Sequence, residues 1–478
     1  MDVSSVIQSL SSKPQQTIRR YAYGTAGFRD RYHETMHHLF VRVGILAALR
    51  SLVCAGKCTG VMVTASHNTE EDNGVKIVDV DGGMLVKKWE VMAEVMANES
   101  LDYFIASILA ILSENDCSGT IPVVMIGQDT RWHSPVLVEC VKEGVELLGG
   151  QVLSVGQVIT PVVHFCVNAF NEAGTLPSEF SSHSVKKGYY EQLYRGYSDL
   201  IKTGGRTTSN SIVLDTANGV GSITTQDFLA CVGSLPGWNL SLVNKAGEGS
   251  VNADCGAEHV QKLQIPPAGI DVESYPNTLL CSFDGDGDRI VFHGMNAGRW
   301  ILLDGDRIAS LVATFLLQEV KEAGLAEHLS VGIVQTAYAN GASTAYLRSL
   351  GISVVFAKTG VKYLHHAAQS LDVGIYFEAN GHGTVIFSAK AQEKVLFGAA
   401  TGSSERQKLA FIRLQACLMV INQTIGDALS DLLLTLAILQ VRLIKYAKLT
   451  LGAPSYFITV VGIGTRLLAV ACNVLGFT

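Results

Sequence analysis

The chain alternates between short apolar runs of strand length and longer segments with helical spacing. Residues 121–126, 211–214 and 331–334 are apolar runs bounded by polar loops, and residues 135–148 have the spacing of an amphipathic helix. The same rhythm predicts further elements at 151–155, 226–232, 240–243, 342–350, 352–356, 361–369 and 373–377. Alternation of this kind predicts an α/β fold with mostly parallel or mixed sheets.

Three breaks in the pattern predict several consecutive α/β domains. A polar stretch at 171–187 precedes a helix expected to begin near Tyr189, and further breaks fall at 296–300 and 402–408. These breaks give segments 1–185, 186–300 and 301–425, each ending a strand in a polar loop, and an atypical apolar tail over 426–478.

The last 23 residues, 456–478, are apolar enough to span a bilayer on length alone. Arg466, Asn473 and three glycines argue against that interpretation, because a central arginine costs about 2.5–3.5 kcal/mol on insertion. We expect a buried or poorly folded segment here, and no membrane as a partner.

Composition narrows the class of protein. A chain of 478 residues with 48% hydrophobic and 17% charged residues is globular and has several domains. A net charge of −7 without a long basic run argues against nucleic acid as a partner. The ten cysteines are scattered, and the close pair Cys54 and Cys58 lacks the second pair of a zinc module. With no secretory signal at the N-terminus, the sequence predicts a cytoplasmic protein with free thiols.

An acidic loop, FDGDGDRI at 283–290, follows the apolar run 279–282. Asp284, Asp286 and Asp288 alternate with glycines, which allow a tight turn that brings the three carboxylates together. Carboxylates at such short distances repel one another unless a cation lies between them. Mg²⁺ is a suitable cation, because it prefers oxygen ligands. An EF-hand is excluded, because Arg289 and Met295 occupy the positions that need glycine and glutamate. A solvated turn is the alternative.

A second loop begins where the strand-like run VMV of VMVTASHNTEEDNGVKI (61–77) ends. Ser66 lacks the glycines of a nucleophile elbow, so acyl chemistry is unsupported. A phosphate on Ser66 would instead offer oxygens to a metal and to donors from His67, Lys76 and Arg29, the last in YGTAGFR. A capped surface turn is the alternative.

Two further loops carry polar side chains. In FEANGHGT (377–384), Glu378, Asn380 and His382 lie at alternate positions and suit sugar hydroxyls; an Asn-Gly hairpin turn is the alternative. In AKTGVK (357–362), Lys358 and Thr359 precede a helix, where they would cradle an anion or position an acid/base lysine. Solvated surface lysines are the alternative there.

These motifs resemble the α-D-phosphohexomutase superfamily. The resemblance rests on TASHN, DNGVK, DGDGDR and FEANGHGT, and YGTAGFR, LDTANGVG, LDGDRIA and VQTAYANG fit the same family between about residues 23 and 434. It implies several α/β domains around a central cleft, and an enzyme that is phosphorylated on Ser66 at rest. It further implies a step toward UDP-N-acetylglucosamine, in which N-acetylglucosamine 6-phosphate and 1-phosphate interconvert through a bisphosphate.

The resemblance also implies roles for the residues already named. The phosphoserine and the three aspartates would bind Mg²⁺, with Arg29, His67, Lys76 and Arg289 around the phosphoryl group. Lys76 is our first choice as general base and His67 the second. The substrate-binding set comprises Arg289, Lys358, Thr359, Glu378, Asn380 and His382. We expect a monomer that binds a small-molecule sugar phosphate.

The chain departs from the family pattern near its end. We find no loop like Arg-Pro-Ser-Gly-Thr-Glu for the non-reacting phosphate, and IGTR at 463–466 lacks the serine and the acid. Because each lost charge-assisted hydrogen bond costs about 1.5–3 kcal/mol, we expect weak or no mutase activity. The rival hypotheses are a mutase for glucose or mannose phosphates, a non-catalytic isoform that binds sugar phosphate, and a phosphatase with Asp284 as nucleophile.

Overall fold

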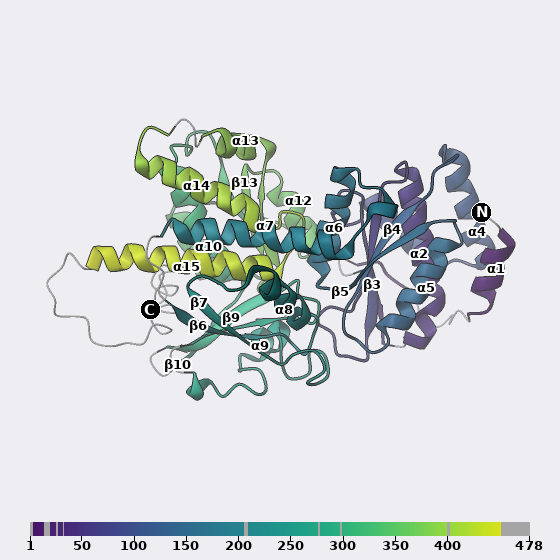
Figure 1. The fold of residues 1–478 in the computed structure, drawn as a ribbon, viewed down its shortest axis with the longest axis horizontal. Helices are drawn as coiled ribbons and strands as arrows, with labels where there is room; N and C mark the ends of the chain where they lie inside the picture. Colours follow the sequence, from purple (N-terminus) through teal and green to yellow (C-terminus); the bar gives the residue numbers. More distant parts are fainter. Residues whose placement is uncertain are drawn as a thin grey trace.

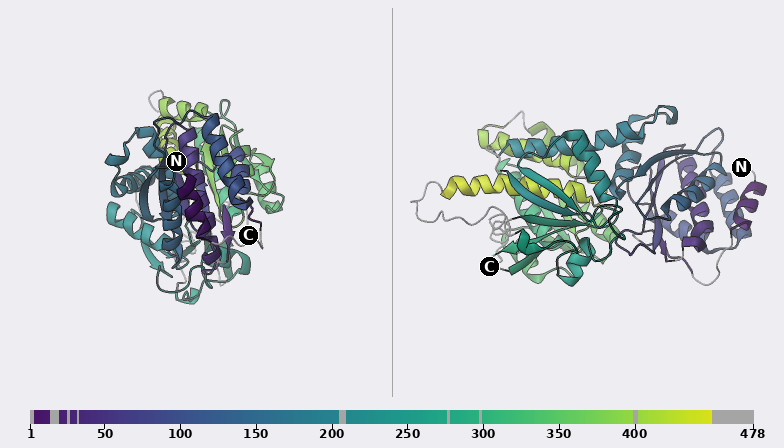
Figure 2. Two further views of the ribbon diagram at one scale, coloured as in Figure 1. Left: turned by 90° about the vertical axis from the view of Figure 1, so that its right-hand side faces the viewer. Right: turned by 60° about the horizontal axis from the view of Figure 1, so that its bottom comes forward.

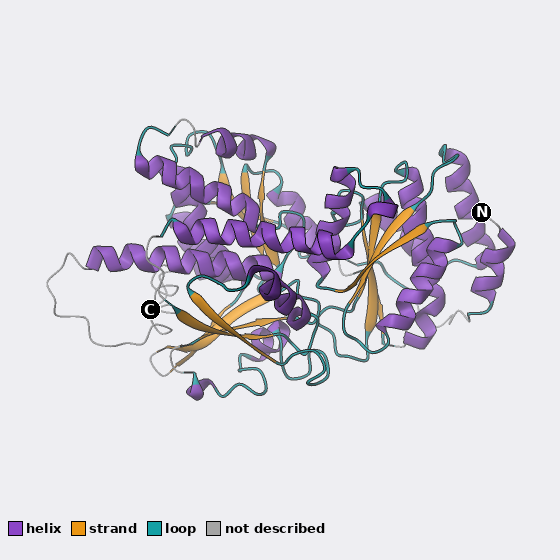
Figure 3. Ribbon diagram, viewed as in Figure 1, coloured by secondary structure: helices purple, strands orange, loops and turns teal. Residues whose placement is uncertain are grey.

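The computed structural model describes residues 3–13, 20–24, 27–31, 33–204, 209–275, 278–296, 299–398 and 402–450. Within them the chain forms three mixed sheets, each flanked by helices (Figure 3). The molecule is elongated, with the first sheet at one end and the other two at the opposite end (Figures 1 and 2). The predicted α/β class with mixed sheets is confirmed.

The first sheet has the strand order β1-β3-β2-β4-β5, in which β3 is antiparallel to both neighbours and β2, β4 and β5 are parallel. Its strands are β1 (Phe28–Asp30), β2 (Thr59–Val63), β3 (Asn73–Val78), β4 (Val123–Gln128) and β5 (Gln151–Gln157). The helices of this region are α1 (Val3–Ser11), η1 (His33–Met36), α2 (His37–Val53), α3 (Lys87–Asn98), α4 (Leu101–Glu114), α5 (Ser134–Glu146) and α6 (Thr160–Ala173).

The buried strand β2 shows how this sheet is packed. Val61 and Val63 belong to the core formed with α2 and α5, whereas Met62 belongs to the core formed with α6. Successive side chains of a strand point to opposite faces, so an uninterrupted apolar run is what a sheet covered on both faces requires.

The second sheet repeats this arrangement in the order β10-β9-β8-β6-β7, with β8, β6 and β7 parallel and β9 antiparallel to β8 and β10. Its strands are β6 (Asn210–Asp215), β7 (Trp238–Val243), β8 (Leu279–Phe283), β9 (Ile290–Asn296) and β10 (Arg299–Leu303), and its helices are α8 (Gly221–Val232), α9 (Ala257–Leu263) and η3 (Val272–Ser274). The predicted break at 296–300 falls between the paired strands β9 and β10, so the sheet continues to Leu303.

The third sheet has the order β12-β11-β13-β14, with only β14 antiparallel. Its strands are β11 (Val331–Gln335), β12 (Ser353–Phe356), β13 (Val373–Phe377) and β14 (Gly383–Phe387). Its helices are α10 (Gly305–Glu322), α11 (Gly341–Ser349), α12 (Val361–Ala368), α13 (Ala389–Gly398) and α14 (Glu405–Val420).

Helix α7 (Ser182–Lys202) follows the short helix η2 (Pro177–Glu179) and packs against α6, α8, α14 and α15. It therefore joins the core of the first sheet to that of the other two. It begins seven residues before the predicted Tyr189, because the Ser181 side chain accepts a hydrogen bond from the Ser184 N–H and caps the helix. The polar composition of its first two turns hid the helix from the hydrophobic pattern.

The prediction of an atypical tail from residue 426 is wrong for its first part. Helix α15 (Ala428–Thr450) lies beside α7 and α10 and against β9 (Figure 1). Leu432, Leu433 and Leu436 are fully buried in the main core. The segments 456–478 and 463–466 lie outside the described residues.

One helical stretch in the described part of the chain, His33–Val53, is long and apolar enough to cross a membrane. Its most apolar part is 83% buried inside the protein, where α2 packs on α5 and the first sheet. This burial is what a core helix requires.

Candidate active site

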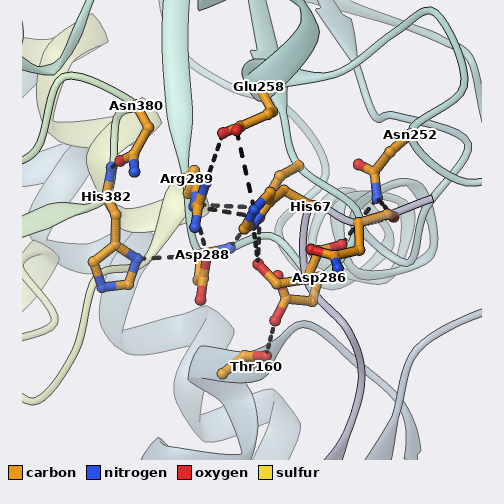
Figure 4. A network of polar contacts seen from close by, with 12 residues as sticks. His67, Thr160, Asn252, Glu258, Asp286, Asp288, Arg289, Asn380 and His382 are labelled. Carbon is orange, nitrogen blue, oxygen red and sulfur yellow. Dashed lines mark hydrogen bonds and ion pairs between the residues drawn. The ribbon is translucent and has the colours of Figure 1, made fainter. Parts of the chain in front are cut away.

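Each sheet contributes one loop to a common site, and the three loops have equivalent positions. The loops leave β2, β8 and β13, and each connects a strand with a parallel neighbour to a strand that runs antiparallel to it. They carry Ser66, the three aspartates and His382, respectively. Figure 4 shows part of this meeting point, with side chains from all three loops. The topology thus brings the predicted motifs together at strand ends, where α/β sheets bind ligands.

Ser66 is buried, with 2% of its surface exposed, and its Oγ donates a hydrogen bond to Asp284 Oδ2 over 2.9 Å. Its φ of 52° is in the left-handed region that only a well-supported loop maintains. Support comes from Asn252 Nδ2, which donates to Ser66 O at 2.9 Å and to Asn68 O at 2.8 Å. Gly285 is required nearby, because a Cβ there would lie 2.8 Å from Ser66 O. The serine is therefore held at a fixed point against the acidic loop.

Asp284, Asp286 and Asp288 form a buried cluster whose ligand oxygens lie within 4.8 Å of one another. Asp286 Oδ1 has no hydrogen-bond partner in the described structure, although it is buried. Buried carboxylate oxygens without partners are costly, and a hard cation satisfies them. The donor set therefore fits a divalent cation, as the sequence predicted.

The electrostatics of the cluster agree with this fit. Burial, followed by the charges of Asp288 and Asp286, raises the pKa of Asp284 well above its ordinary value. Burial acts in the same direction on Asp288, but Lys76 and His382 outweigh it and hold the pKa of Asp288 well below its ordinary value. A cation would relieve the repulsion that Asp284 experiences.

Lys76, the predicted general base, lies directly against the cluster. Its Nζ is 2.8 Å from Asp286 Oδ2 and 3.0 Å from Asp288 Oδ2. Burial lowers the pKa of Lys76, but the two carboxylates outweigh burial and raise it overall. In this geometry Lys76 is an ammonium that neutralises the acidic loop, and it would have to release a proton before acting as the predicted base.

His67 and Arg289 lie near the serine. His67 Nδ1 is 3.4 Å from Ser66 Oγ, and its Nε2 is 4.0 Å from Glu258 Oε1. Burial, then Arg289, lowers the pKa of His67 to about 4. Arg289 donates from Nη1 to Glu258 Oε2 at 2.8 Å and places Nε 3.8 Å from Asp284 Oδ2. A guanidinium and an imidazole therefore face the space beside Ser66 Oγ.

The predicted sugar loop closes the site from the third sheet. His382 Nδ1 lies 3.4 Å from Asp288 Oδ1, and the His382 N–H donates to Asn380 Oδ1 at 3.0 Å. A Cβ at Gly426 would lie 2.8 Å from two atoms of the His382 ring, so the ring packs directly on this glycine. The segment before α15 therefore fixes the sugar loop.

Two adjoining pockets share Arg289 and Glu378 in their walls. The first has a cavity volume of about 80 Å³ and is lined by Ser66, Lys76 and His382, among others. The second has a cavity volume of about 310 Å³ and is lined by residues that include His67, Asp306, Thr336, Tyr338, Thr359 and Asn380. The second cavity is within the size range of small-molecule sites, and Arg289 borders both cavities.

Two predicted residues lie at the margin. Arg29 is exposed, and its Nη1 donates to Asn68 Oδ1 at 2.9 Å. Asn68 is two residues after Ser66 in the chain. Lys358 is exposed and lines neither of these pockets. The second lysine of the same motif, Lys362, lines the first pocket, donates from Nζ to Leu85 O at 2.7 Å and contacts Glu90.

Sequence reasoning missed several supporting residues. Thr160 Oγ1 donates to Asp286 Oδ2 at 2.6 Å, and Arg131 Nη2 donates to Asn68 O at 2.6 Å. Arg131 follows β4 in the polar run QDTR, so the strand-end rule that found the other loops identifies it as well. Thr160, Asn252 and Glu258 are single polar residues without a local pattern.

Family models match most of this chain. Phosphoacetylglucosamine mutase AMG1, domain II, matches residues 176–291, and domain III of the same protein matches residues 304–443. Phosphoglucomutase/phosphomannomutase, alpha/beta/alpha domain I, matches residues 44–103 and 88–176. The domain III match extends past residue 426, in agreement with the buried start of α15.

Curated relatives are similar over most of their length. Phosphoacetylglucosamine mutase 1 of Schizosaccharomyces pombe is 42% identical over 426 residues, which cover 88% of this chain and 80% of the relative. Human phosphoacetylglucosamine mutase is 40% identical over 450 residues, covering 92% of this chain and 80% of the relative.

Solved structures show the same likeness in three dimensions. A variant of Aspergillus fumigatus N-acetylphosphoglucosamine mutase in complex with glucose 1,6-bisphosphate has a TM-score of 0.86 and 36% identity, covering 92% of this chain and 81% of that one. The enzyme from the same organism with GlcNAc-6P and magnesium has a TM-score of 0.84, with the same identity and coverage.

Proposed function

The chain belongs to the phosphoacetylglucosamine mutase family, and from that premise we propose that it interconverts N-acetylglucosamine 6-phosphate and N-acetylglucosamine 1-phosphate with Ser66 as phosphoryl carrier. The observation that carries the proposal is the 2.9 Å contact between Ser66 Oγ and Asp284 Oδ2 in a pocket that also holds Lys76 and Arg289. A hydroxyl in that position has an acidic metal loop on one side and cationic side chains around it.

The transfer balances as an exchange between two oxygens. The bond from phosphorus to Ser66 Oγ breaks, and a bond from phosphorus to the sugar hydroxyl oxygen forms. The hydroxyl proton passes to a base, and Ser66 Oγ regains a proton. The sugar is then a bisphosphate, and after it turns over its other phosphate returns to Ser66. Such transfers depend mainly on positioning and on neutralising charge, which buried cations next to the serine supply.

The cation we propose is Mg²⁺, held by Asp284, Asp286 and Asp288 together with an oxygen of the Ser66 phosphate. When bound, it neutralises charge on the phosphoryl oxygens. The all-oxygen donor set and the unpartnered Asp286 Oδ1 support this choice. The A. fumigatus relative in complex with GlcNAc-6P and magnesium supports it as well.

The remaining predicted residues receive roles by their positions. Three residues of the third sheet's loop bind sugar hydroxyls: Glu378, which lines both pockets, Asn380, which lines the second, and His382, which lines the first. Arg289, Arg29 and His67 surround the phosphoryl group, and Lys358 and Thr359 contact the substrate from the 357–362 loop. Lys76 remains our first choice as general base, a role that requires it first to release a proton, and His67, which is neutral near pH 7, is the second. The kcat values of Lys76→Ala and of His67→Ala, measured across pH, separate the two assignments.

The substrate is a small sugar phosphate, and we propose a cytosolic monomer. The nine cysteines in the described part of the chain are unpaired, which supports a reducing compartment. Light scattering of the purified protein tests the monomer.

The test of the function combines mass and rate. We expect intact mass spectrometry to find a phosphate that maps to Ser66, and Ser66→Ala to abolish conversion of N-acetylglucosamine 6-phosphate in a coupled assay primed with glucose 1,6-bisphosphate. Turnover of plain hexose phosphates at an equal or higher rate would favour the mutase for glucose or mannose phosphates. Phosphatase activity that survives Ser66→Ala would favour Asp284 as nucleophile. Sugar-phosphate binding without turnover or phosphate on Ser66 would favour the non-catalytic isoform.

A further inference from the structure

His164 lies on helix α6, one turn after a residue that touches the acidic loop. Thr160 Oγ1 donates to Asp286 Oδ2 at 2.6 Å, as Figure 4 shows, and the Thr160 N–H donates to Asp286 O at 2.9 Å. Residues four apart on a helix share one face, one turn apart. His164 therefore lies on the face of α6 that meets the metal loop.

The ring of His164 has a fixed tautomer. Its Nδ1 is 2.6 Å from Gly82 O. A carbonyl oxygen only accepts, so Nδ1 carries the hydrogen and Nε2 presents a lone pair. No protein group among the described residues hydrogen-bonds Nε2, although the side chain is buried. An acceptor is therefore left for a ligand.

Such a ligand would occupy the first pocket, which His164 lines together with Ser66, Lys76 and Arg289. Burial, more than any other cause, lowers the pKa of His164 to about 4, and the ring is neutral near pH 7. A neutral acceptor is unsuited to a phosphate, whose oxygens carry little hydrogen at that pH, and it suits a hydroxyl. Lys76 and Arg289 are the donors for phosphate in the same pocket.

We propose that His164 Nε2 accepts the hydrogen bond of the sugar hydroxyl that receives the phosphoryl group from Ser66. The inference rests on the proposed function and makes His164 a catalytic residue, because it touches the reacting hydroxyl. Its acceptor holds the hydroxyl hydrogen away from phosphorus until the proposed base, Lys76 or His67, takes the proton, and an oxygen lone pair is left free to attack. The same acceptor serves both orientations of the sugar, since each presents one free hydroxyl to the phosphoserine.

Two substitutions separate this role from a structural one. In His164→Asn the side-chain amide occupies the place of Nδ1, so donation to Gly82 O is kept and the acceptor at Nε2 is lost. In His164→Gln the side-chain oxygen reaches the place of Nε2, so the acceptor is kept and the bond to Gly82 O is lost. We expect kcat to fall about 10- to 100-fold in His164→Asn with an unchanged melting temperature. His164→Gln is expected to melt earlier but to keep kcat within about tenfold of the parent protein.

The measurement is kcat and KM for N-acetylglucosamine 6-phosphate, with the phosphate on Ser66 measured by intact mass in every variant. A wild-type kcat in His164→Asn, or a loss in His164→Gln as large as in His164→Asn, would overturn the proposal. Failure of the proposed function is a different result, because the parent protein itself would then show no turnover and no phosphate on Ser66.

Discussion

Lys76 Nζ lies 2.8 Å from Asp286 Oδ2, and this ion pair joins strand β3 of the first sheet to the acidic loop of the second. The two residues are 210 positions apart, and both side chains are buried. Neither charge has enough water to stabilise it, so each depends on the other. The free energy of unfolding therefore depends on both charged side chains of this ion pair being present in the site.

Replacing Lys76 with methionine keeps most of the side-chain volume and removes the charge. Breaking one side of a buried ion pair typically costs about 3–5 kcal/mol. We expect Lys76→Met to lower the free energy of unfolding by about that amount and to abolish mutase activity, measured by urea unfolding and the coupled assay. Lys187→Met is the matched control, because Lys187 is 54% exposed and its loss should cost less than about 0.5 kcal/mol. Equal unfolding curves for the two variants would contradict the structural role.

The acidic cluster predicts that Mg²⁺ stabilises the protein as well as activating it. At a concentration 100 times its dissociation constant, a ligand that binds only the folded state adds about 2.7 kcal/mol. We expect Mg²⁺ to raise the melting temperature, EDTA to reverse the rise and remove activity, and Asp286→Asn to need more Mg²⁺ for both effects. Asp306→Asn, in the second pocket, should respond like the parent protein. A melting temperature that is indifferent to Mg²⁺ would argue against the site.

Gly426 supports the sugar loop by having no side chain. In Gly426→Ala the new Cβ would lie 2.8 Å from the His382 ring, so the ring must move and its 3.4 Å contact with Asp288 Oδ1 changes. We expect kcat/KM to fall at least tenfold, because moving the His382 ring disrupts the positioning of the substrate in the site. Gly188→Ala is the control: a Cβ there meets nothing within 4 Å, and alanine favours its helix. Unchanged kinetics in Gly426→Ala would show that His382 has room to adapt.

The sequence predicted the site best where chemistry follows a buried strand. Each of the strands β2, β8 and β13 is an apolar run, and a polar loop follows it directly. This pattern is local and can be recognised in the sequence. Thr160, Asn252 and Glu258 reach the site through pairing of distant segments, and nothing next to them in the chain marks them. Their positions follow from tertiary structure alone.

The AKTGVK motif shows a second limit of sequence reasoning. Its two lysines, Lys358 and Lys362, are four residues apart on either side of a Thr-Gly turn. The sequence around them does not show which of the two reaches the site. The structure exposes Lys358 and places Lys362 against Leu85 O and Glu90. Likewise, the apolar residues of α15 are compatible with a tail or a core helix, and only the neighbours α7 and α10 decide between them.

Asp306 predicts a pH dependence that can be assigned to one residue. Burial, the largest cause, raises the pKa of Asp306 to about 6; Asp304 raises it further, and the Asn340 N–H and Arg307 oppose the rise. In the unfolded chain an aspartate titrates near 3.9, so the folded state binds this proton more tightly. The free energy of unfolding therefore decreases as pH rises from about 4 to about 6, and the deficit persists above that window.

Replacing Asp306 with asparagine tests the sign of this effect. The side-chain oxygen still accepts the hydrogen bond that the Asn340 N–H makes at 2.9 Å, but no charge develops. The free energy of unfolding of Asp306→Asn should exceed that of the parent by at most about 3 kcal/mol at pH 7, and the difference should shrink toward pH 4. Melting curves at pH 4.5, 5.5 and 7 measure the trend, and exposed Asp227→Asn supplies the baseline. Parallel pH profiles for Asp306→Asn and the parent would mean that Asp306 does not carry the effect, because the contributions of all other carboxylates cancel in the comparison.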